Sequence, residues 1–352
     1  MVVNSIDYQG NQIYEYEDKQ IYRISPPFKI YEKKPFKYIN ILSKIFWEVF
    51  YSWRHIRKNI DQYDLLHTFG NSWTIGFLSW YFAKNNKPII RELCNDMSNP
   101  LYPIQIQRFM KNIFQKENTL VVAISKRLEI LAKKFDMKNV WMRPNPIDEN
   151  RFFVDYKKKF KLRNELTKFN EDDVVLSCLA NFIIRKNHIF LLEVLSFLPE
   201  KYKMVLAGPL KDEGKEYFRQ IQNKIEKLNL QSRVDLKVGF NDNFDEYLKC
   251  SDVFLFPSLS EGLGTPVLES QACGVPVVSN HLKDITDTVI KNGKGGYYLG
   301  MDVSNWVEAI KKAQSIKREV LVENAKYIYK ISSSSLIDNE YHKKIQSLIN
   351  LN

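Results

Sequence analysis

Two glutamates, Glu261 and Glu269, stand eight residues apart on either side of a segment suited to holding a phosphate. The apolar run 253–258 predicts a strand, and a helix is expected to follow, with Thr265 as its N-cap, Pro266 in its first position and Glu269 in its first turn. A helix N-terminus offers unpaired N–H groups and a partial positive charge to an anion. Carboxylates accept hydrogen bonds from hydroxyls. This pattern predicts a ligand with hydroxyls on both sides of its phosphates, such as a nucleotide sugar.

The loop between the two glutamates is glycine-rich, with Gly262 and Gly264 flanking Leu263. Glycine lets the backbone approach a ligand closely. For a bare pair of glutamates, the simpler interpretation is a favourable first-turn charge at Glu269 and a solvated loop residue at Glu261. The combination of strand, glycine loop and helix favours the binding site.

A second candidate group is the basic pair Arg185 and Lys186, in the loop that follows the predicted strand 173–182. A guanidinium forms bidentate hydrogen bonds to phosphate, and an ammonium adds a compact charge. Alone, such a pair is usually a solvated surface pair. Its place between a buried strand and a helix predicts a role in binding a diphosphate.

Strands and helices alternate regularly in the second half of the chain. Strands are predicted at 173–182, 203–208, 233–240, 253–258 and 275–280, and helices at 188–198, 213–228, 244–251 and 266–273. This alternation is typical of a parallel sheet covered on both faces, with ligands at the carboxyl ends of the strands.

The first half alternates less regularly, and 352 residues suit two domains. We expect a hairpin over 11–24, a helix over 36–59, and strands within 63–70, 88–93, 119–125 and 139–148. The charged run 156–165 suggests a junction near 150–170. The predicted division is 1–160, 161–330 and a C-terminal helix over 331–352 that crosses back to the first domain.

The net charge of +11 belongs entirely to the first half, where residues 1–165 hold 28 Lys and Arg against 17 Asp and Glu. Such a surface attracts acidic partners. No nucleic-acid-binding motif accompanies the charge, so nucleic acid is not expected as a partner. An acidic membrane or a lipid-linked acceptor fits better.

The segment 36–59 could provide that contact, because it combines large apolar residues with Lys and Arg. We expect its apolar residues to pack on the N-terminal sheet and its basic rim to face a membrane or a lipid-linked acceptor. The apolar residues are Ile41, Ile45, Phe46, Val49, Phe50 and Trp53. Neither a secretory signal nor a spanning helix is predicted, so we expect a cytoplasmic protein at the inner face of the cell membrane.

The string EGLGTPVLESQACGVPVVSN (261–280) closely resembles the donor-site signature of the family-4 retaining glycosyltransferases, also called glycosyl transferases group 1. The resemblance implies the GT-B fold, an α/β fold in which two Rossmann-like, doubly wound domains face each other across a cleft. It also implies a hexosyltransferase-type enzyme that needs no metal or other cofactor. The chain contains no D-x-D motif, which metal-dependent glycosyltransferases of another fold use to hold the cation.

The resemblance also assigns roles to residues. Glu269 would bond the ribose hydroxyls, Glu261 a sugar hydroxyl near the reacting carbon, and Arg185 and Lys186 the diphosphate. The remaining donor contacts would come from Gly262, Leu263, Gly264, Thr265, Gly208, Pro209 and Phe240. The stretch 143–152 resembles the PNGVD-type stretch of the family, and we expect an architectural role for it.

Two features depart from the family pattern. Residues 1–30 contain a single glycine, Gly10. The glycine-rich βα unit that usually opens the first domain is therefore missing, shortened or divergent. Cys94 stands where many members have a His. His67 and Asp96 are the remaining candidates for the reacting face.

The predicted function is transfer of a sugar from a nucleotide-sugar donor to a glycan or glycolipid hydroxyl, with retention of anomeric configuration, in polysaccharide or lipopolysaccharide assembly. The donor nucleotide is UDP, GDP or ADP. One alternative is a GT-B enzyme of another class, a sugar-nucleotide epimerase or a phosphorylase. The other is an inactive donor-site relic that binds a membrane or a protein partner.

Overall fold

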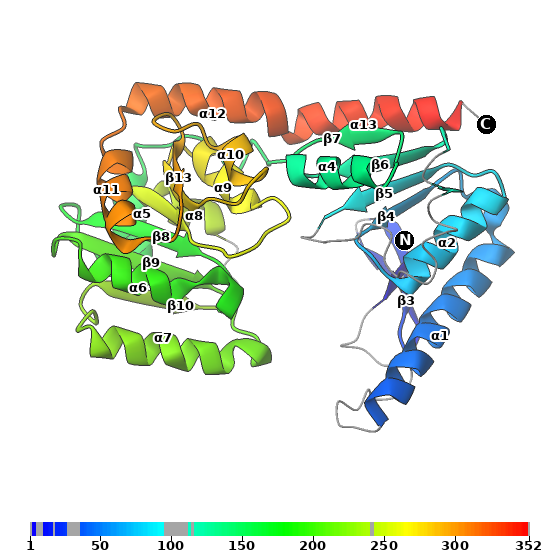
Figure 1. Ribbon diagram of the computed structural model, residues 1–352, viewed down its shortest axis with the longest axis horizontal. Coiled ribbons are helices and arrows are strands. Elements are labelled where there is room, and N and C mark those ends of the chain that lie inside the picture. Colours follow the sequence, from blue (N-terminus) through cyan, green and yellow to red (C-terminus); the bar gives the residue numbers. More distant parts are fainter. Residues whose placement is uncertain are drawn as a thin grey trace. The chain divides into compact units, whose positions relative to one another are not determined.

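The computed structural model describes most of the chain, which divides into two compact units (Figure 1). The described residues are 2–4, 10–16, 18–26, 36–94, 112–113, 116–239 and 243–350. The first unit comprises Met1–Ala123, Glu129–Trp141 and Lys343–Asn352, and the second comprises Ile124–Leu128 and Met142–His342.

The second unit is built on a six-stranded parallel sheet with the order β10-β9-β8-β11-β12-β13. Its strands are β8 (Val174–Leu179), β9 (Tyr202–Gly208), β10 (Val234–Val238), β11 (Val253–Phe256), β12 (Val277–Asn280) and β13 (Gly296–Leu299). The order reverses between β8 and β11, as in the doubly wound nucleotide-binding fold. The expected parallel sheet is confirmed, and β13 extends it beyond the predicted strands.

Helices cover both faces of this sheet (Figure 1). They are α5 (Lys159–Leu166), α6 (His188–Ser196), α7 (Lys215–Lys227), α8 (Phe244–Lys249), α9 (Thr265–Ala272), α10 (Thr286–Val289), α11 (Val303–Gln314) and α12 (Arg318–Ser332). The last helix, α13 (Ser334–Ile349), is divided between the two units, because the second ends at His342 and the first resumes at Lys343. On one face α6 lies between α7 and α11, and on the other α9 packs against α12. Successive strand side chains point to opposite faces, so each layer of helices buries its own half of the strand residues.

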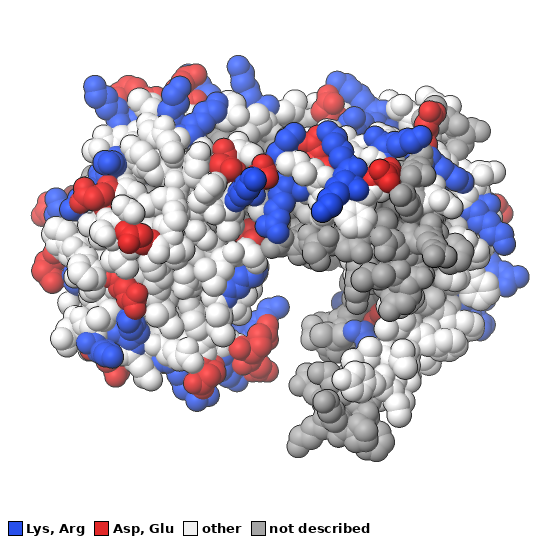
Figure 2. All heavy atoms as spheres, viewed as in Figure 1, with Lys and Arg blue, Asp and Glu red and all other residues white. Residues whose placement is uncertain are grey.

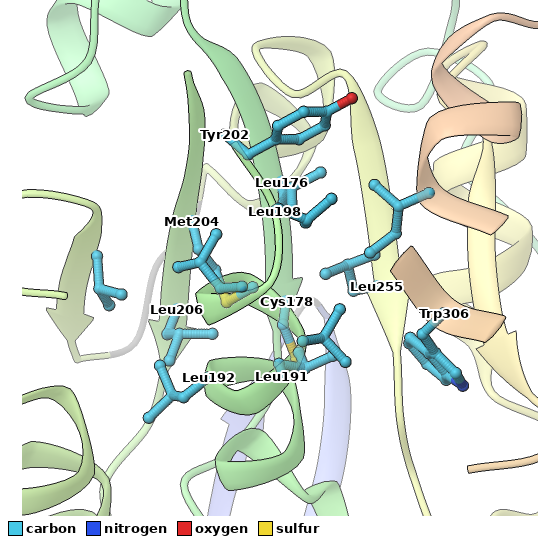
Figure 3. Packing of buried hydrophobic residues seen from close by; sticks show 14 of the residues in the cluster. Leu176, Cys178, Leu191, Leu192, Leu198, Tyr202, Met204, Leu206, Leu255 and Trp306 are labelled. Carbon is cyan, nitrogen blue, oxygen red and sulfur yellow. The ribbon is translucent and has the colours of Figure 1, made fainter. Parts of the chain in front are cut away.

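The core under α6 and α11 is apolar and fully buried (Figure 3). Leu176, Met204 and Leu206 from the strands meet Leu191 of α6 and Trp306 of α11 there. Burying a large apolar side chain contributes about 1.5–3 kcal/mol. This core fixes the strand ends that carry the loops of the site.

The first unit contains two sheets. A four-stranded sheet has the order β4-β5-β6-β7, and a three-stranded sheet has the order β1-β3-β2. Their elements are β1 (Val2–Asn4), β2 (Gln12–Tyr16), β3 (Lys19–Ile24), α1 (Phe36–Lys58), β4 (Leu66–Phe69), α2 (Trp73–Lys84), β5 (Ile89–Leu93), β6 (Thr119–Ala123), α4 (Lys126–Lys134) and β7 (Val140–Met142). The hairpin prediction is confirmed, because β2 pairs antiparallel with β3. Ser125 caps α4 through a bond from the Leu128 amide.

The helix α1 buries less of its apolar surface than expected. It packs against α2 and β3, and Ile56 is buried there. The prediction that all its large apolar residues pack on the sheet is wrong for Ile41 and Phe46, which are exposed. The exposed set extends along the first half of the helix and includes Tyr38, Ile39 and Leu42. None of the helices described is long and apolar enough to cross a membrane.

Most residues of α5 belong to the charged run 156–165, and this helix lies inside the second unit. The main segment of that unit begins at Met142, before the charged run. Over residues 166–352 the positive and negative charges balance, and Figure 2 shows Lys and Arg interspersed with Asp and Glu on the second unit. Unlike most charged residues of this unit, Arg163 of α5 is buried, with only 1% of its surface exposed.

The buried Arg163 connects α5 to the amino-terminal end of β8. Its guanidinium donates to the carbonyls of Asp173 (2.7 Å) and Cys250 (3.1 Å) and to the Asp252 carboxylate (2.8 Å). Asp252 in turn accepts from the Val175 amide of β8. A buried cation needs this many acceptors to offset its lost hydration.

Replacing Arg163 should therefore be costly. We expect Arg163→Met to lower the free energy of unfolding by about 3–5 kcal/mol, because it takes this donor from several carbonyls and one charged partner from Asp252. Urea unfolding followed by circular dichroism would measure this. Lys161→Met, on the exposed side of the same helix, is the control and should change stability by less than about 0.5 kcal/mol. Equal effects of the two substitutions would contradict this account of Arg163.

Candidate donor site

A pocket lies at the carboxyl ends of β8 and β9, next to the point where the strand order reverses. Its volume is about 550 Å³, and all of its lining residues belong to the second unit. It is lined by Arg151, Phe152, Leu179, Ala180, Asn181, Arg185, Lys186, Ala207, Gly208, Pro209, Phe244, Tyr247, Thr265, Pro266 and Glu269. Doubly wound sheets bind their ligands at this place, because the loops on the two sides of the reversal diverge and leave a crevice.

The helix α9 opens onto this pocket, with a start that differs from the prediction. Gly264 is the N-cap residue, with φ at 83°, and Thr265 begins the helix without capping it. A Cβ at Gly264 would lie 2.9 Å from the Phe256 ring, so both the backbone angle and the space require glycine. The N-cap assignment to Thr265 is wrong. Its hydroxyl instead accepts from the Asn145 amide at 2.8 Å.

Glu269 consequently lies in the second turn of α9, and its predicted first-turn position is also wrong. Pro266 has no amide hydrogen and stands in the first turn, where an intrahelical bond is not required. Leu263 is buried and anchors the loop, while Gly262 is half-buried beside it. The start of α9 thereby forms the pocket edge that is lined by Thr265 and Pro266.

Glu261 joins the two basic residues to this loop. Its Oε1 lies 2.5 Å from Lys186 Nζ and 2.9 Å from an Arg185 guanidinium nitrogen. The same Arg185 nitrogen donates to the Ser260 carbonyl at 2.5 Å. Glu261 is only 9% exposed, which rules out a solvated loop residue. The structure thus brings Glu261, Arg185 and Lys186 together, and the last two also line the pocket.

Close backbone packing shapes the opposite wall. A Cβ at Gly208, the last residue of β9, would lie 2.1 Å from the Ala180 carbonyl oxygen, so the ends of β8 and β9 can meet only with glycine there. The Pro209 carbonyl then accepts from the Phe182 amide at 3.1 Å. Phe240, predicted for the same wall, lies outside the described residues.

An ionic cluster that the sequence analysis missed lies next to the pocket and reaches it through Arg151. Asp245 Oδ1 lies 2.8 Å from Arg151 Nε, and Asp245 Oδ2 lies 2.9 Å from Lys249 Nζ. Lys249 also donates to the Arg151 carbonyl at 2.7 Å. Arg151 ends the stretch 143–152, which we expected to be architectural, yet Arg151 and Phe152 line the pocket. The spacing of Asp245 and Lys249 on one helical face was the signal available in the sequence.

The environment of Glu269 differs from that of Glu261. Burial raises the pKa of Glu269 to about 7, with the positive charge of Arg151 opposing the shift and the negative charge of Asp245 adding to it. For Asp245 burial acts in the same direction, but the bonds from Arg151 and Lys249 outweigh it and hold its pKa below the usual value. Asp245 therefore pairs with the positive charges of Arg151 and Lys249. Within the residues that the structure describes, the carboxyl of Glu269 has no such ion pair, and it is neutralised by a proton or by a ligand.

The weaker candidates lie in the first unit. His67 of β4 bonds through Nε2 to Glu92 Oε1 of β5 at 2.8 Å. Arg91 is fully buried beside it and donates to Asn71. Asp96 lies outside the described residues. His67 therefore has a carboxylate partner that would orient its ring, as both structural and catalytic histidines do.

The raised pKa of Glu269 makes stability depend on pH. An unfolded carboxyl titrates near 4.5 and the folded one near 7, so folding loses free energy as pH rises through this window. We expect Glu269→Gln to be more stable than the parent protein at pH 8.5 by up to about 3 kcal/mol, and to lose this advantage at pH 5. Thermal unfolding at both pH values tests it.

The exposed Glu226→Gln on α7 serves as the control for this comparison, and it should follow the pH dependence of the parent protein. The same shift in both variants, or none in Glu269→Gln, would contradict the environment described for Glu269.

A known protein family resembles the part of the chain that holds most of the pocket residues. The family model described as "Glycosyl transferases group 1" matches residues 159–328. The chain is 33% identical over 166 residues to "Putative glycosyltransferase EpsF" of Bacillus subtilis, covering 43% of this chain and 40% of that protein. It is 27% identical over 165 residues to "Capsular polysaccharide biosynthesis glycosyltransferase CapH" of Staphylococcus aureus, covering 46% and 45%. The matches thus span less than half the length of these curated relatives.

Among solved structures, the fold resembles that of Anabaena Alr3699/HepE in complex with UDP, with a TM-score of 0.75 at 15% identity over 93% of this chain and 86% of that one. The structural likeness extends over both units, whereas the family model covers the parallel sheet and helices of the second. The predicted fold class is confirmed, and residues 159–328, which match the family model of glycosyl transferases group 1, lie in the second unit of this GT-B fold.

Proposed function

We propose that this protein is a retaining, metal-independent hexosyltransferase that moves a sugar from a UDP-linked donor to a hydroxyl of a glycan or glycolipid acceptor. Its biological setting would be the assembly of cell-surface polysaccharide or lipopolysaccharide. The observation that carries the proposal is the cluster of Glu261, Arg185 and Lys186 beside the start of α9, at one end of a pocket that has Glu269 at its other side.

The distribution of charge fits a nucleotide sugar. Arg185, Lys186 and the first amides of α9 supply positive charge for a diphosphate. Glu269 accepts hydrogen bonds from ribose hydroxyls, and a neutral Glu269 would lose one such acceptor. Leu179, Ala207 and Tyr247 offer an apolar surface to a base. UDP is the preferred nucleotide because Anabaena Alr3699/HepE, which has a similar fold, was crystallised in complex with UDP.

The reaction breaks the bond between the anomeric carbon and the diphosphate and forms a bond from that carbon to the acceptor oxygen. Arg185 and Lys186 stabilise the charge that develops on the departing nucleoside diphosphate. The acceptor attacks from the face that the diphosphate leaves, so configuration is retained. The acceptor proton passes to a phosphate oxygen of the leaving group. Glu261 holds the sugar by a hydroxyl near the reacting carbon.

The helix α1 offers a surface for peripheral membrane binding. Tyr38, Ile39, Leu42 and Phe46 are 62–69% exposed, and Lys44 lies among them. Apolar residues with basic neighbours bind the interface of an anionic bilayer. This would keep the enzyme near a lipid-linked acceptor.

Nucleotide binding gives the first test. Calorimetric titration with UDP, GDP and ADP should show binding of UDP, and Arg185→Ala/Lys186→Ala should weaken it by about 100-fold or more, because two charge-assisted interactions are lost. Lys215→Ala/Arg219→Ala on α7 removes the same charge from the same unit and should change the affinity less than about twofold. Absence of binding by all three nucleotides would favour the inactive relic.

A second substitution separates catalysis from binding. Glu261→Gln should abolish sugar transfer while it leaves sedimentation with anionic vesicles unchanged. Nuclear magnetic resonance of the product should show the anomeric configuration of the donor, and activity should persist in a chelator. A free sugar nucleotide or sugar phosphate as product would instead identify an epimerase or a phosphorylase.

A further inference from the structure

A second pocket lies wholly within the first unit, between the β2–β3 hairpin and α1. Its volume is about 240 Å³. It is lined by Asn11, Gln12, Ile13, Tyr22, Arg23, Ile24, Tyr51, Arg54, His55 and Lys58. None of these residues belongs to the donor pocket, and the proposed transfer reaction uses none of them.

One face of α1 forms one wall of this pocket. Tyr51, Arg54, His55 and Lys58 are spaced by three, one and three residues, which places them together on a helix. Arg23 of β3 contributes to the opposite wall. Its guanidinium donates to Gln12 Oε1 at 3.2 Å and to the Tyr14 hydroxyl at 3.1 Å, which fixes its position at the rim.

The pocket wall is strongly positive, with three permanent cations and no carboxylate among those lining residues that the structure describes. Elsewhere on α1, Lys44 lies 3.6 Å from Glu48, and Arg57 lies over the Trp53 ring at 5.1 Å. In the described part of the chain, Arg54 and Lys58 form no such contact. Like charges four residues apart destabilise a helix by a few tenths of a kcal/mol. An anion between them would remove this repulsion.

Aromatic rings complete the pocket and give it room for more than an anion. The Tyr22 and His55 ring centroids lie 4.0 Å apart with the rings tilted by 41°, and His55 Nε2 lies 3.1 Å from the Tyr63 hydroxyl. Tyr51 is half-buried on the same side. A volume of 240 Å³ corresponds to roughly eight water molecules at about 30 Å³ each. Ligand sites commonly combine such apolar and aromatic walls with a few convergent charged groups.

From these features we propose that the pocket binds a phosphorylated carbohydrate, with its phosphate between Arg54, Lys58 and Arg23 and its sugar ring against Tyr22 and Tyr51. Guanidinium and ammonium groups together suit the tetrahedral oxygens of a phosphate. The phosphate can belong to a soluble sugar phosphate or to a sugar joined to a lipid through phosphate. The site is independent of the donor site and of the proposed transfer reaction.

Calorimetry at low ionic strength tests the pocket, with glucose 6-phosphate as the probe. The full chain would carry Arg185→Ala/Lys186→Ala so that the donor site does not take up the probe. We expect a dissociation constant below about 1 mM, binding of inorganic phosphate about tenfold weaker, and no heat from glucose. Adding Arg54→Gln/Lys58→Gln should weaken glucose 6-phosphate binding roughly 30-fold.

The control is Lys134→Gln/Lys138→Gln, which removes the same charge from exposed positions of the same unit and should change affinity less than about twofold. Equal losses in both pairs, or no binding of glucose 6-phosphate, would overturn the proposal. Tyr51→Leu provides a second test, since this substitution should weaken the binding of glucose 6-phosphate but not that of inorganic phosphate. Equal weakening of both would exclude the sugar contact.

Vesicles distinguish the two sources of the phosphate once the soluble probe binds. Sedimentation with phosphatidylcholine vesicles that contain phosphatidic acid, lost in Arg54→Gln/Lys58→Gln, would show that the cations reach a lipid phosphate. Sedimentation unchanged by that substitution would assign the pocket to soluble sugar phosphates.

Discussion

The reversal of strand order between β8 and β11 is the constraint on which the site depends. Parallel strands must be connected by crossovers, and the crossovers leave in opposite directions at this point. The loop that carries Arg185 and Lys186 and the loop that carries Glu261 therefore border the same opening. The buried core beneath, with Leu176 and Leu255, holds the two strands in register. The Lys186–Glu261 ion pair thereby joins residues 75 positions apart in the sequence.

Two glutamates on one short segment acquire different properties from their surroundings. Glu261 has two cations within hydrogen-bonding distance, so its negative charge is compensated before any ligand arrives. Glu269 is half-buried near Arg151, whose guanidinium is bonded to Asp245, and its pKa is raised. One carboxylate is thus fixed by ion pairs, while the other remains available to hydroxyl donors. This division of roles follows from neighbours contributed by α8 and by the stretch 143–152.

The sequence predicted the parts of this site that depend on short-range patterns. The strand–glycine–helix unit around Gly264 and the basic pair Arg185 and Lys186 could be recognised because their residues are adjacent. The start of α9 was misplaced by one residue, since a left-handed glycine cap and a threonine cap have the same sequence context. Arg151 and Asp245 were missed because they are 94 residues apart and only the fold brings them together. The exposure of Phe46 likewise depends on how far α1 extends past its neighbours.

The salt bridges of Glu261 also affect which anions can bind to Arg185 and Lys186. Arg185 and Lys186 do not present bare positive charge to the solvent, because each already holds the same carboxylate oxygen. A small inorganic anion would have to break these contacts and would leave a nearly buried carboxylate without partners, which is costly. A nucleotide sugar can offer its phosphates to the cations and a hydroxyl to Glu261 in the same event. A ligand that satisfies both the cations and Glu261 is therefore expected to bind more tightly than a small inorganic anion, because it leaves no buried charge without a partner.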